Sequence, residues 1–459
     1  MSTPPPLLPP MPDHRPDRVP LWKHLALFRA DILSTQPARR YPAKLAEVKQ
    51  PCLQSVMLNT PNLGRRVLQE RPRDFPKSAR VREGLRLLLG NSVFVTNGDD
   101  WARQRRIIDP AFEGGRLRDS FPAMWAAAQA SAARLRPGVQ EIEAEMSHAA
   151  ADVIFRTLFS LPIEDKTAAQ VYHSFRAHQR SAPIVNLAAL LRLPGWLPRP
   201  FARNTRATAA HIRALITALT EARMQAITAG MAPADLATKI MTTPDPQTGA
   251  CFTTGEMVDQ VAIFFLAGHE TSASALAWAL YLVASNPNWQ AQLAQEAEVL
   301  RPYLDSATAP DFGVLRRMPL IRDTMREALR LYPPVPMLVR ETARPEVFRK
   351  RKLERVAQVI VSLWHLGRHE EIWPDPHAFD PERWQREGTK ACARDGYLPF
   401  SAGPRVCPGA GFAMAEAVLI LARLLLEWQF QALPDKRPVP IAHMTVRARD
   451  GIWLECRKR

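Results

Sequence analysis

The chain has 459 residues, of which 46% are hydrophobic and 23% are charged, so it has the composition of an ordinary globular protein with ample core. Its formal net charge of +16 leaves three kinds of partner open, namely nucleic acid, an anionic membrane and an acidic protein. No zinc-finger, basic-zipper or RNA-recognition motif accompanies the positive charge, and a solvated basic surface is its simplest interpretation.

Neither the N-terminus nor the hydropathy pattern indicates a membrane anchor. Residues 1–20 hold eight prolines and no apolar segment, which predicts a proline-rich, weakly ordered lead-in. The longest unbroken apolar run, at 275–284, is much shorter than the roughly 18 residues that a transmembrane span requires. The five cysteines are odd in number and lack metal-type spacing. We therefore expect a soluble, cytoplasmic protein with reduced thiols.

Helical periodicity dominates the chain as far as Leu331. It predicts a short helix at 62–70 and longer ones at 78–89, 99–109, 122–136, 140–160, 167–182, 201–228, 254–285, 287–301 and 319–331. Strand-like runs are few, at 55–59, 356–361, 444–447 and 452–456. No repeat and no long linker is visible. We expect residues 21–459 to form a single domain that is mainly α with a small β region.

The helix at 99–109 carries a pair of hydrogen-bond donors. Trp101 and Arg105 lie four residues apart and therefore share one helical face. An indole N–H and a guanidinium both donate, and together they suit a carboxylate. An ordinary amphipathic surface helix also explains the pair, and is the more frequent case.

The helix at 254–285 is the longest predicted element. At 1.5 Å per residue it runs roughly 48 Å, enough to cross the molecule. Residues 261–266 are apolar on every side, so we expect the helix to be buried. Glu270 and Thr271 follow closely, and Gly268 in mid-helix costs about 1 kcal/mol relative to alanine. A generic core helix would avoid both features, which therefore indicate a functional site.

Glu327 and Arg330 have the i, i+3 spacing of a salt bridge within one helix. The spacing alone is nearly uninformative, because Glu298 and Arg301 match it too. Its place in the chain gives it weight, since Arg383 and then a distinctive cysteine loop follow it.

This loop, at residues 400–409, is rich in glycine and proline and precedes a strongly helical stretch. We expect that helix to start at Pro408, so that its positive end favours the thiolate form of Cys407. Gly403 and Gly409 allow close backbone approach to a large, flat group, and Arg405 could grip an anion on it. A buried structural cysteine is the alternative.

The pattern Phe-x-x-Gly-x-Arg-x-Cys-x-Gly resembles the haem-binding loop of the cytochrome P-450 family, in which the cysteine thiolate is the fifth ligand of haem iron. The matching residues are Phe400, Gly403, Arg405, Cys407 and Gly409. The central Ala-Gly-x-Glu-Thr stretch, from Ala267 to Thr271, is similar to the oxygen-binding groove of that family. The resemblance covers the chain from roughly residue 50 to the end.

The resemblance implies the cytochrome P-450 fold, with haem b buried between the long central helix and the helix after the cysteine loop. It makes Cys407 the iron ligand, Gly268 part of the oxygen groove, and Glu270 and Thr271 the proton-delivering pair. It assigns the remaining haem contacts to Trp101, Arg105, Ala267, Arg340, Phe400, Gly403, Arg405 and Gly409. It joins Glu327, Arg330 and Arg383 in a buried charge triad.

The resemblance further implies a monooxygenase that inserts one oxygen atom from O2 into an apolar substrate. Electrons would come from a separate ferredoxin or flavoprotein reductase, because the chain has no flavin, nicotinamide or iron–sulfur motif. The pocket would lie within regions 80–100, 175–205 and 335–338, and its lining residues would be Phe264, Val335, Met337 and Leu338. For the last three, ordinary strand packing is an equally good explanation.

Two other functions stay open. The same fold could use hydrogen peroxide, or isomerise a peroxide, without an electron donor. A basic helical protein that binds nucleic acid without haem would also account for the charge; we expect no such binding. One stretch departs from the family, which commonly has Ile-Pro-x-Gly where this chain has Leu353-Glu354-Arg355-Val356. A β-branched valine tolerates positive φ poorly, so no type II turn is expected there.

Overall fold

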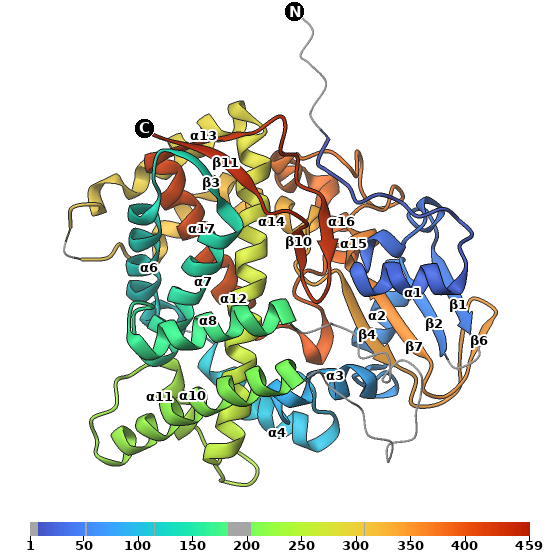
Figure 1. The fold of residues 1–459 in the computed structure, drawn as a ribbon, viewed down its shortest axis with the longest axis horizontal. Coiled ribbons are helices and arrows are strands. Elements are labelled where there is room, and N and C mark those ends of the chain that lie inside the picture. The colour runs from blue at the N-terminus through green and yellow to red at the C-terminus, as the bar shows by residue number, and fades with distance from the viewer. Residues whose placement is uncertain (1–7, 51–52, 114, 182–202, 307) are drawn as a thin grey trace, which may run out of the picture.

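The computed structural model describes residues 8–50, 53–113, 115–181, 203–306 and 308–459 (Figure 1). Its α-helices are α1 (Leu21–Ala30), α2 (Pro61–Arg65), α3 (Ala79–Leu89), α4 (Gly98–Ile108), α5 (Arg116–Asp119), α6 (Phe121–Arg134), α7 (Ile142–Phe159), α8 (Lys166–Ser181), α10 (Arg203–Thr228), α11 (Leu236–Thr242), α12 (Thr254–Ala284), α13 (Pro287–Ala297), α14 (Pro319–Leu331), α15 (Leu363–Leu366), α16 (Glu387–Gly396) and α17 (Ala410–Glu427). Its strands are β1 (Leu45–Gln50), β2 (Leu53–Leu58), β3 (Gly138–Glu141), β4 (Met337–Glu341), β5 (Glu346–Phe348), β6 (Arg351–Leu353), β7 (Gln358–Ser362), β8 (Trp428–Ala432), β9 (Pro440–Ala442), β10 (Val446–Ala448) and β11 (Trp453–Lys458).

Helix α12 runs through the middle of the helical part of the molecule, as Figure 1 shows. Its start is fixed by a capping box, in which the Thr253 side chain accepts from the Glu256 N–H and the Glu256 carboxylate accepts from the Thr253 N–H. Most of its residues are buried, and they belong to the main hydrophobic core together with residues of α7 and α17. The predicted buried, molecule-crossing helix is therefore confirmed.

The largest sheet has four strands in the order β1-β2-β7-β4 and lies apart from the helical bundle (Figure 1). Strands β1 and β2 pair antiparallel, β2 and β7 parallel, and β7 and β4 antiparallel. A second core of apolar residues packs against this sheet. The remaining strands form the small sheets β3-β11-β8, β9-β10 and β5-β6. The architecture is the predicted one, mainly helical with a small β region.

Three predicted helices differ from the observed elements. The helix expected at 287–301 ends as α13 at Ala297 and continues as a 3-10 helix over Glu298–Tyr303. The helix expected at 140–160 begins at Ile142, because residues 138–141 form strand β3 against β11. The helix expected at 62–70 splits into α2 and a π-helical turn at Arg66–Glu70. The pairing of β3 with β11 is a tertiary contact, which periodicity alone does not encode.

The expectation for the stretch before β7 was wrong. Val356 has a φ of +65°, and the Ala357 N–H donates to the Glu354 carbonyl at 3.2 Å, which closes a turn with the left-handed third residue that type II requires. Thr342, just after β4, explains why valine is held there. Its carbonyl accepts from the Val356 N–H at 2.8 Å, and its hydroxyl accepts from the Ala357 N–H at 3.0 Å.

The described part of the lead-in, residues 8–20, contains no helix or strand, but it packs on the body of the protein. Pro9, Pro10 and Pro12 are buried, and the Tyr332 hydroxyl donates to the Pro10 carbonyl at 2.7 Å. Within the described ranges, no helix combines the length and the apolar character needed to cross a bilayer.

Candidate cofactor site

The cysteine loop is held by its own backbone and by the π-helical turn at Arg66–Glu70. The Cys407 N–H donates to the Phe400 carbonyl at 2.9 Å, which closes the loop. Gly403 has a φ of +68°, and a Cβ there would lie 2.0 Å from the Leu68 carbonyl oxygen. Gly403 is therefore required by close approach of this turn. A Cβ on Gly409 would meet only ordinary contacts, with the Cys407 sulfur at 3.9 Å.

The environment of Cys407 differs from the prediction in one respect. Helix α17 begins at Ala410 rather than at Pro408, so the sulfur is set back from the helix end. The thiol is accessible to solvent, yet protein crowds its other sides. The resulting desolvation raises the pKa of Cys407, against smaller lowering effects of the Gly409 N–H and of Arg105. The protein alone therefore favours the thiol, and coordination by a metal would be what deprotonates it.

A stripe of accessible residues interrupts the buried helix α12. Ala267 is exposed, and Phe264, Gly268 and Thr271 are half-buried, although the residues around them are buried. Spacings of three and four residues place these four on one helical face. The Thr271 hydroxyl donates to the Ala267 carbonyl at 2.6 Å, so the lone pairs of its oxygen remain available.

Gly268 belongs to the accessible stripe, and it also packs against a neighbouring helix. A Cβ at this position would lie 2.4 Å from Cδ1 of Ile154 on α7. Close packing of α7 therefore explains why this position of α12 is glycine. The oxygen-groove role assigned to it by resemblance is a separate matter and stays a prediction.

The ring of Phe112 connects the stripe with the cysteine loop. It lies 6.0 Å from the Phe264 ring on α12 and 6.5 Å from the Phe412 ring on α17, measured between centroids. Its edge also lies 4.0 Å from the position that a Cβ of Gly409 would occupy. The predicted groove residues and the predicted ligand loop therefore lie on either side of one aromatic ring.

A group of basic side chains gathers at the edge of this region. Burial lowers the pKa of Arg340 to about 10, and burial with the nearby charges of Arg340 and Arg105 lowers that of Arg405 to about 10. Burial, Arg340 and Arg405 together depress the pKa of Lys77. Among the described residues, no carboxylate forms an ion pair with Lys77, Arg340 or Arg405. Such a concentration of buried and half-buried positive charge calls for an anionic partner.

The predicted donors on α4 join this group. The Arg405 guanidinium lies over the Trp101 ring, and it donates to the Thr96 carbonyl at 2.9 Å and to Asn97 Oδ1 at 2.8 Å. Arg105 donates to the Val406 carbonyl at 2.7 Å. An ion pair with Asp109, at 2.7 Å, compensates the charge of Arg105.

These features fit haem b. The accessible thiol is a suitable axial ligand, the apolar stripe on α12 and Phe112 suit a flat apolar ring, and the unpaired cations suit its propionates. The residues brought together are those predicted from the sequence, with Lys77 in addition. No sequence signal points to Lys77, because its position near Arg340 depends on an isolated bridge between two distant segments.

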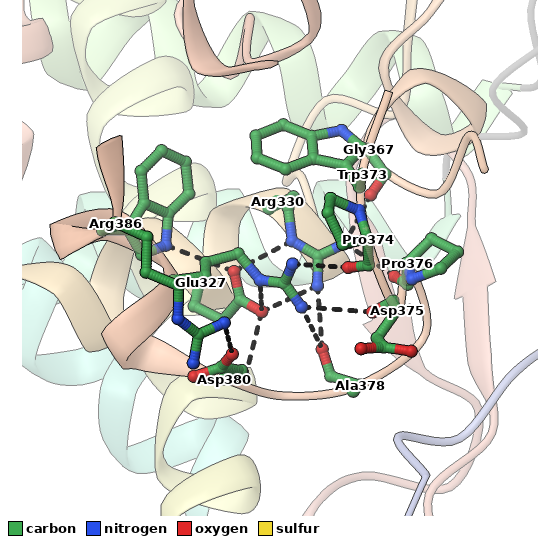
Figure 2. A network of polar contacts seen from close by, with 12 residues as sticks. Glu327, Arg330, Gly367, Trp373, Pro374, Asp375, Pro376, Ala378, Asp380 and Arg386 are labelled. Carbon is green, nitrogen blue, oxygen red and sulfur yellow. Dashed lines mark hydrogen bonds and ion pairs between the residues drawn. The ribbon is translucent and has the colours of Figure 1, made fainter. Parts of the chain in front are cut away.

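The predicted charge triad is fully buried (Figure 2). The carboxylate of Glu327 binds Arg330 at 2.7 and 2.9 Å and Arg383 at 3.0 Å. The guanidinium groups also donate to carbonyls of the segment between them, at Gly367, Pro374, Asp375, Pro376 and Ala378. The Trp384 indole and the Asp380 N–H donate to Glu327 as well. This network fixes the polypeptide that leads into the cysteine loop.

The predicted pocket residues have a mixed outcome. Val335, Met337 and Leu338 are half-buried, and Leu338 packs on the smaller core next to the sheet. Phe264 lies in the accessible stripe of α12. Part of the predicted pocket wall, residues 182–202, lies outside the described residues.

Sequence reasoning did not find the partners of Glu270. This carboxylate is directed towards the C-terminal hairpin, where Thr445 and Arg447 donate to one oxygen, while Gln179 of α8 donates to the other. These three donors come from segments far from α12 in the sequence, and no local pattern links them to it.

Comparison with known proteins agrees with the geometry. Residues 14–454 match the family model of cytochrome P-450. The chain is similar to a cyclooctat-9-en-7-ol 5-monooxygenase of Streptomyces melanosporofaciens, with 31% identity over 91% of this chain and 89% of the relative. It is likewise similar to a pentalenene oxygenase of Streptomyces avermitilis, with 31% identity over 84% of each chain.

Among solved structures, the fold is similar to that of the cytochrome P450DA haem domain, with a TM-score of 0.80, 24% identity, and coverage of 99% of this chain and 98% of that one. The comparisons decide against a basic, haem-free nucleic-acid-binding protein. The chain belongs to the cytochrome P-450 family and is a haem-dependent monooxygenase.

Proposed function

We propose that Cys407 ligates the haem iron and that Lys77, Arg105, Arg340 and Arg405 hold the propionates. The observation that carries this assignment is the gathering of Lys77, Arg340 and Arg405 without a paired carboxylate among the described residues, next to the loop of an accessible thiol. When bound, the haem supplies the activation of O2, and a thiolate ligand favours O–O cleavage.

The substrate that we propose is an apolar organic molecule, of the lipid, terpenoid or aromatic kind. Phe264, Ala267 and Phe112 would border it, because they form the accessible apolar surface between α12 and the cysteine loop. The two bacterial relatives are named for cyclooctat-9-en-7-ol and pentalenene, which supports a substrate of this kind.

In this proposal, Thr271 binds at the accessible stripe and Glu270 supplies the proton. The Thr271 oxygen is held at the accessible stripe by its bond to Ala267, so it can accept a hydrogen bond from a group beside it. Glu270, one residue earlier, is the nearest carboxylate in the chain, but its side chain is directed away from the stripe. A proton therefore has to reach Thr271 through a rotation of Glu270 or through water.

Electrons would come from a separate ferredoxin or flavoprotein reductase in the cytoplasm. The chain has no motif for a second redox cofactor, and its net charge of +16 suits an acidic donor protein. The cysteines are scattered and odd in number, which is typical of a protein that stays in a reducing compartment.

The test is the absorption spectrum of the reduced protein with carbon monoxide. Wild-type protein and a Cys392→Ala control, which alters a cysteine on α16, should both give the thiolate-type spectrum. Cys407→Ala should lose it while the protein stays folded. An unchanged spectrum in Cys407→Ala would refute the ligand assignment. Displacement of iron-bound water by apolar probe compounds, read from the same absorption, would identify the substrate class.

A further inference from the structure

The side chain of Asn97 is directed away from the helix that it precedes. Asn97 is the residue before α4, a position at which an asparagine side chain commonly caps the free N–H groups of the helix. Here the side chain makes no such bond with α4. In the described part of the chain, its hydrogen bonds go to Lys77 and Arg405, which belong to two other segments. Helix capping therefore does not account for the contacts of this residue.

The carboxamide of Asn97 matches its surroundings atom by atom. Its Oδ1 accepts from the Lys77 N–H at 2.9 Å and from the Arg405 guanidinium at 2.8 Å, and its Nδ2 donates to the Lys77 carbonyl at 3.1 Å. A carboxylate could not make all three bonds, because it has no N–H to donate. One neutral, half-buried side chain thus joins the cysteine loop, the start of α4 and the segment before α3.

Lys77 is held from two further sides. Its backbone forms an isolated antiparallel bridge with Arg340, and its ammonium nitrogen lies 4.0 Å from the centroid of the Phe94 ring. The bridge brings Lys77 next to Arg340, and Asn97 joins the same Lys77 backbone to Arg405. The three cations of the basic group are therefore linked through contacts that meet at Lys77 and Asn97.

The neutrality of Asn97 matters as much as its shape. Its side chain occupies a place where a carboxylate would form an ion pair with Arg405. Among the described residues, no carboxylate forms an ion pair with Lys77, Arg340 or Arg405. An amide oxygen accepts the hydrogen bond of the guanidinium but does not compensate its charge. The positive charge of the group therefore stays available to an anionic ligand.

We propose that Asn97 is a positioning residue of the cofactor site, which directs Arg405 and the Lys77 segment towards the haem propionates and leaves the positive charge uncompensated for them. The inference rests on the proposed function, in which these cations hold the propionates. Asn97 acts through the two cations and not by contact with the haem. Its role has two separable parts: the geometry needs its hydrogen bonds, and the charge needs its side chain to be neutral.

Asn97→Asp tests the part that depends on charge, because aspartate keeps the acceptor oxygen but adds a negative charge beside Arg405. We expect the haem-loaded variant to lose haem roughly tenfold more readily than wild type, measured by transfer to an acceptor protein. Asn91→Asp is the control. Asn91 is exposed and its Oδ1 accepts from Arg82 at 2.9 Å, so the same change beside another arginine should leave haem transfer unchanged.

The reduction potential of the haem supplies a second readout. A negative charge added near the cofactor favours its oxidised form, so the potential of Asn97→Asp should be more negative than that of wild type. Asn97→Leu removes the hydrogen bonds without adding charge. It should also lose haem roughly tenfold more readily, while its potential stays close to that of wild type. A purely structural role would affect Asn97→Leu alone, because Asn97→Asp retains the acceptor oxygen.

Haem transfer at the wild-type rate in Asn97→Asp would overturn the inference, and this result is decisive even if Asn97→Leu fails to fold. Arg405→Leu separates the inference from the proposed function. If Arg405→Leu retains haem as wild type does, the propionate assignment falls and the inference falls with it. If Arg405→Leu loses haem readily but both Asn97 variants retain it, the inference alone is overturned. Faster haem loss in all three variants, with a more negative potential in Asn97→Asp, is the result expected.

Discussion

Arg405 lies across the face of Trp101, with its guanidinium carbon 4.3 Å from the ring centroid. The two side chains come from the cysteine loop and from α4. The contact therefore ties the loop of Cys407 to the helix of Arg105, and it fixes the direction in which the guanidinium points. Because the guanidinium lies over the ring, the N–H groups at its edge remain free for hydrogen bonds, two of which go to Thr96 and Asn97.

Replacing the ring tests whether this contact orients Arg405 for the propionates. Trp101→Leu keeps an apolar side chain but removes the cation–π interaction, which contributes about 1–2 kcal/mol at a partly desolvated site. We expect haem affinity to fall roughly 5- to 30-fold, measured by transfer of haem to an acceptor protein. Trp22→Leu is the control, because Trp22 is 72% exposed. Equal haem loss from both variants would contradict the assignment.

The buried triad should contribute to stability, and a second Glu–Arg pair with the same i, i+3 spacing provides the control. Glu327→Gln leaves Arg330 and Arg383 buried without a counter-charge, which should reduce the free energy of unfolding by about 3–5 kcal/mol. Glu298→Gln alters an exposed pair with Arg301 and should cost no more than about 1 kcal/mol. Urea denaturation measures both. A small loss in Glu327→Gln would show that the carbonyls bound by the two arginines suffice to hold the segment.

At Val356 we expect a substitution to increase the free energy of unfolding. The left-handed backbone of Val356 costs a non-glycine residue about 1–2 kcal/mol. Glycine would relieve this strain, but part of the gain is lost because glycine has more conformational entropy in the unfolded chain. Val356→Gly should therefore stabilise the protein by about 0.5–1 kcal/mol in urea denaturation. Val356→Thr, which keeps the branched side chain, should not stabilise it. Destabilisation by glycine would mean that packing of the valine side chain outweighs the strain.

Motifs with a fixed local spacing were predictable from the sequence. The cysteine loop, the polar stretch of α12 and the Glu327–Arg330 pair each lie within a few residues, and the fold brings them together. Lys77, Gln179 and Arg447 were not predictable, because each contributes from a separate element and only tertiary packing places it. The turn at Val356 was predicted wrongly for the same reason, since Thr342, 14 positions earlier in the chain, determines its backbone.

Glu416 on α17 should make the stability of the protein depend on pH. The side chain is 1% exposed, Ser272 donates to one oxygen at 3.2 Å, and the other oxygen has no partner among the described residues. Burial raises its pKa to about 8 from the ordinary value of 4.5. The folded protein therefore retains a proton that the unfolded chain releases. This contribution to stability is complete below pH 4.5 and is lost as the pH rises towards 8.

Glu416→Gln removes the titration but keeps the size of the side chain and an acceptor for Ser272. We expect the free energy of unfolding of the wild type to decrease relative to that of the variant between pH 5 and pH 8, a window set by the raised pKa of Glu416. Because Glu143 also has a raised pKa, of about 7, the comparison is best made in a Glu143→Gln background, so that the difference between the two proteins reports Glu416. Denaturant titrations at several pH values give both slopes. Identical slopes with and without Glu416 would show that the buried carboxyl group is ionised throughout, and that the lone oxygen finds a compensating donor.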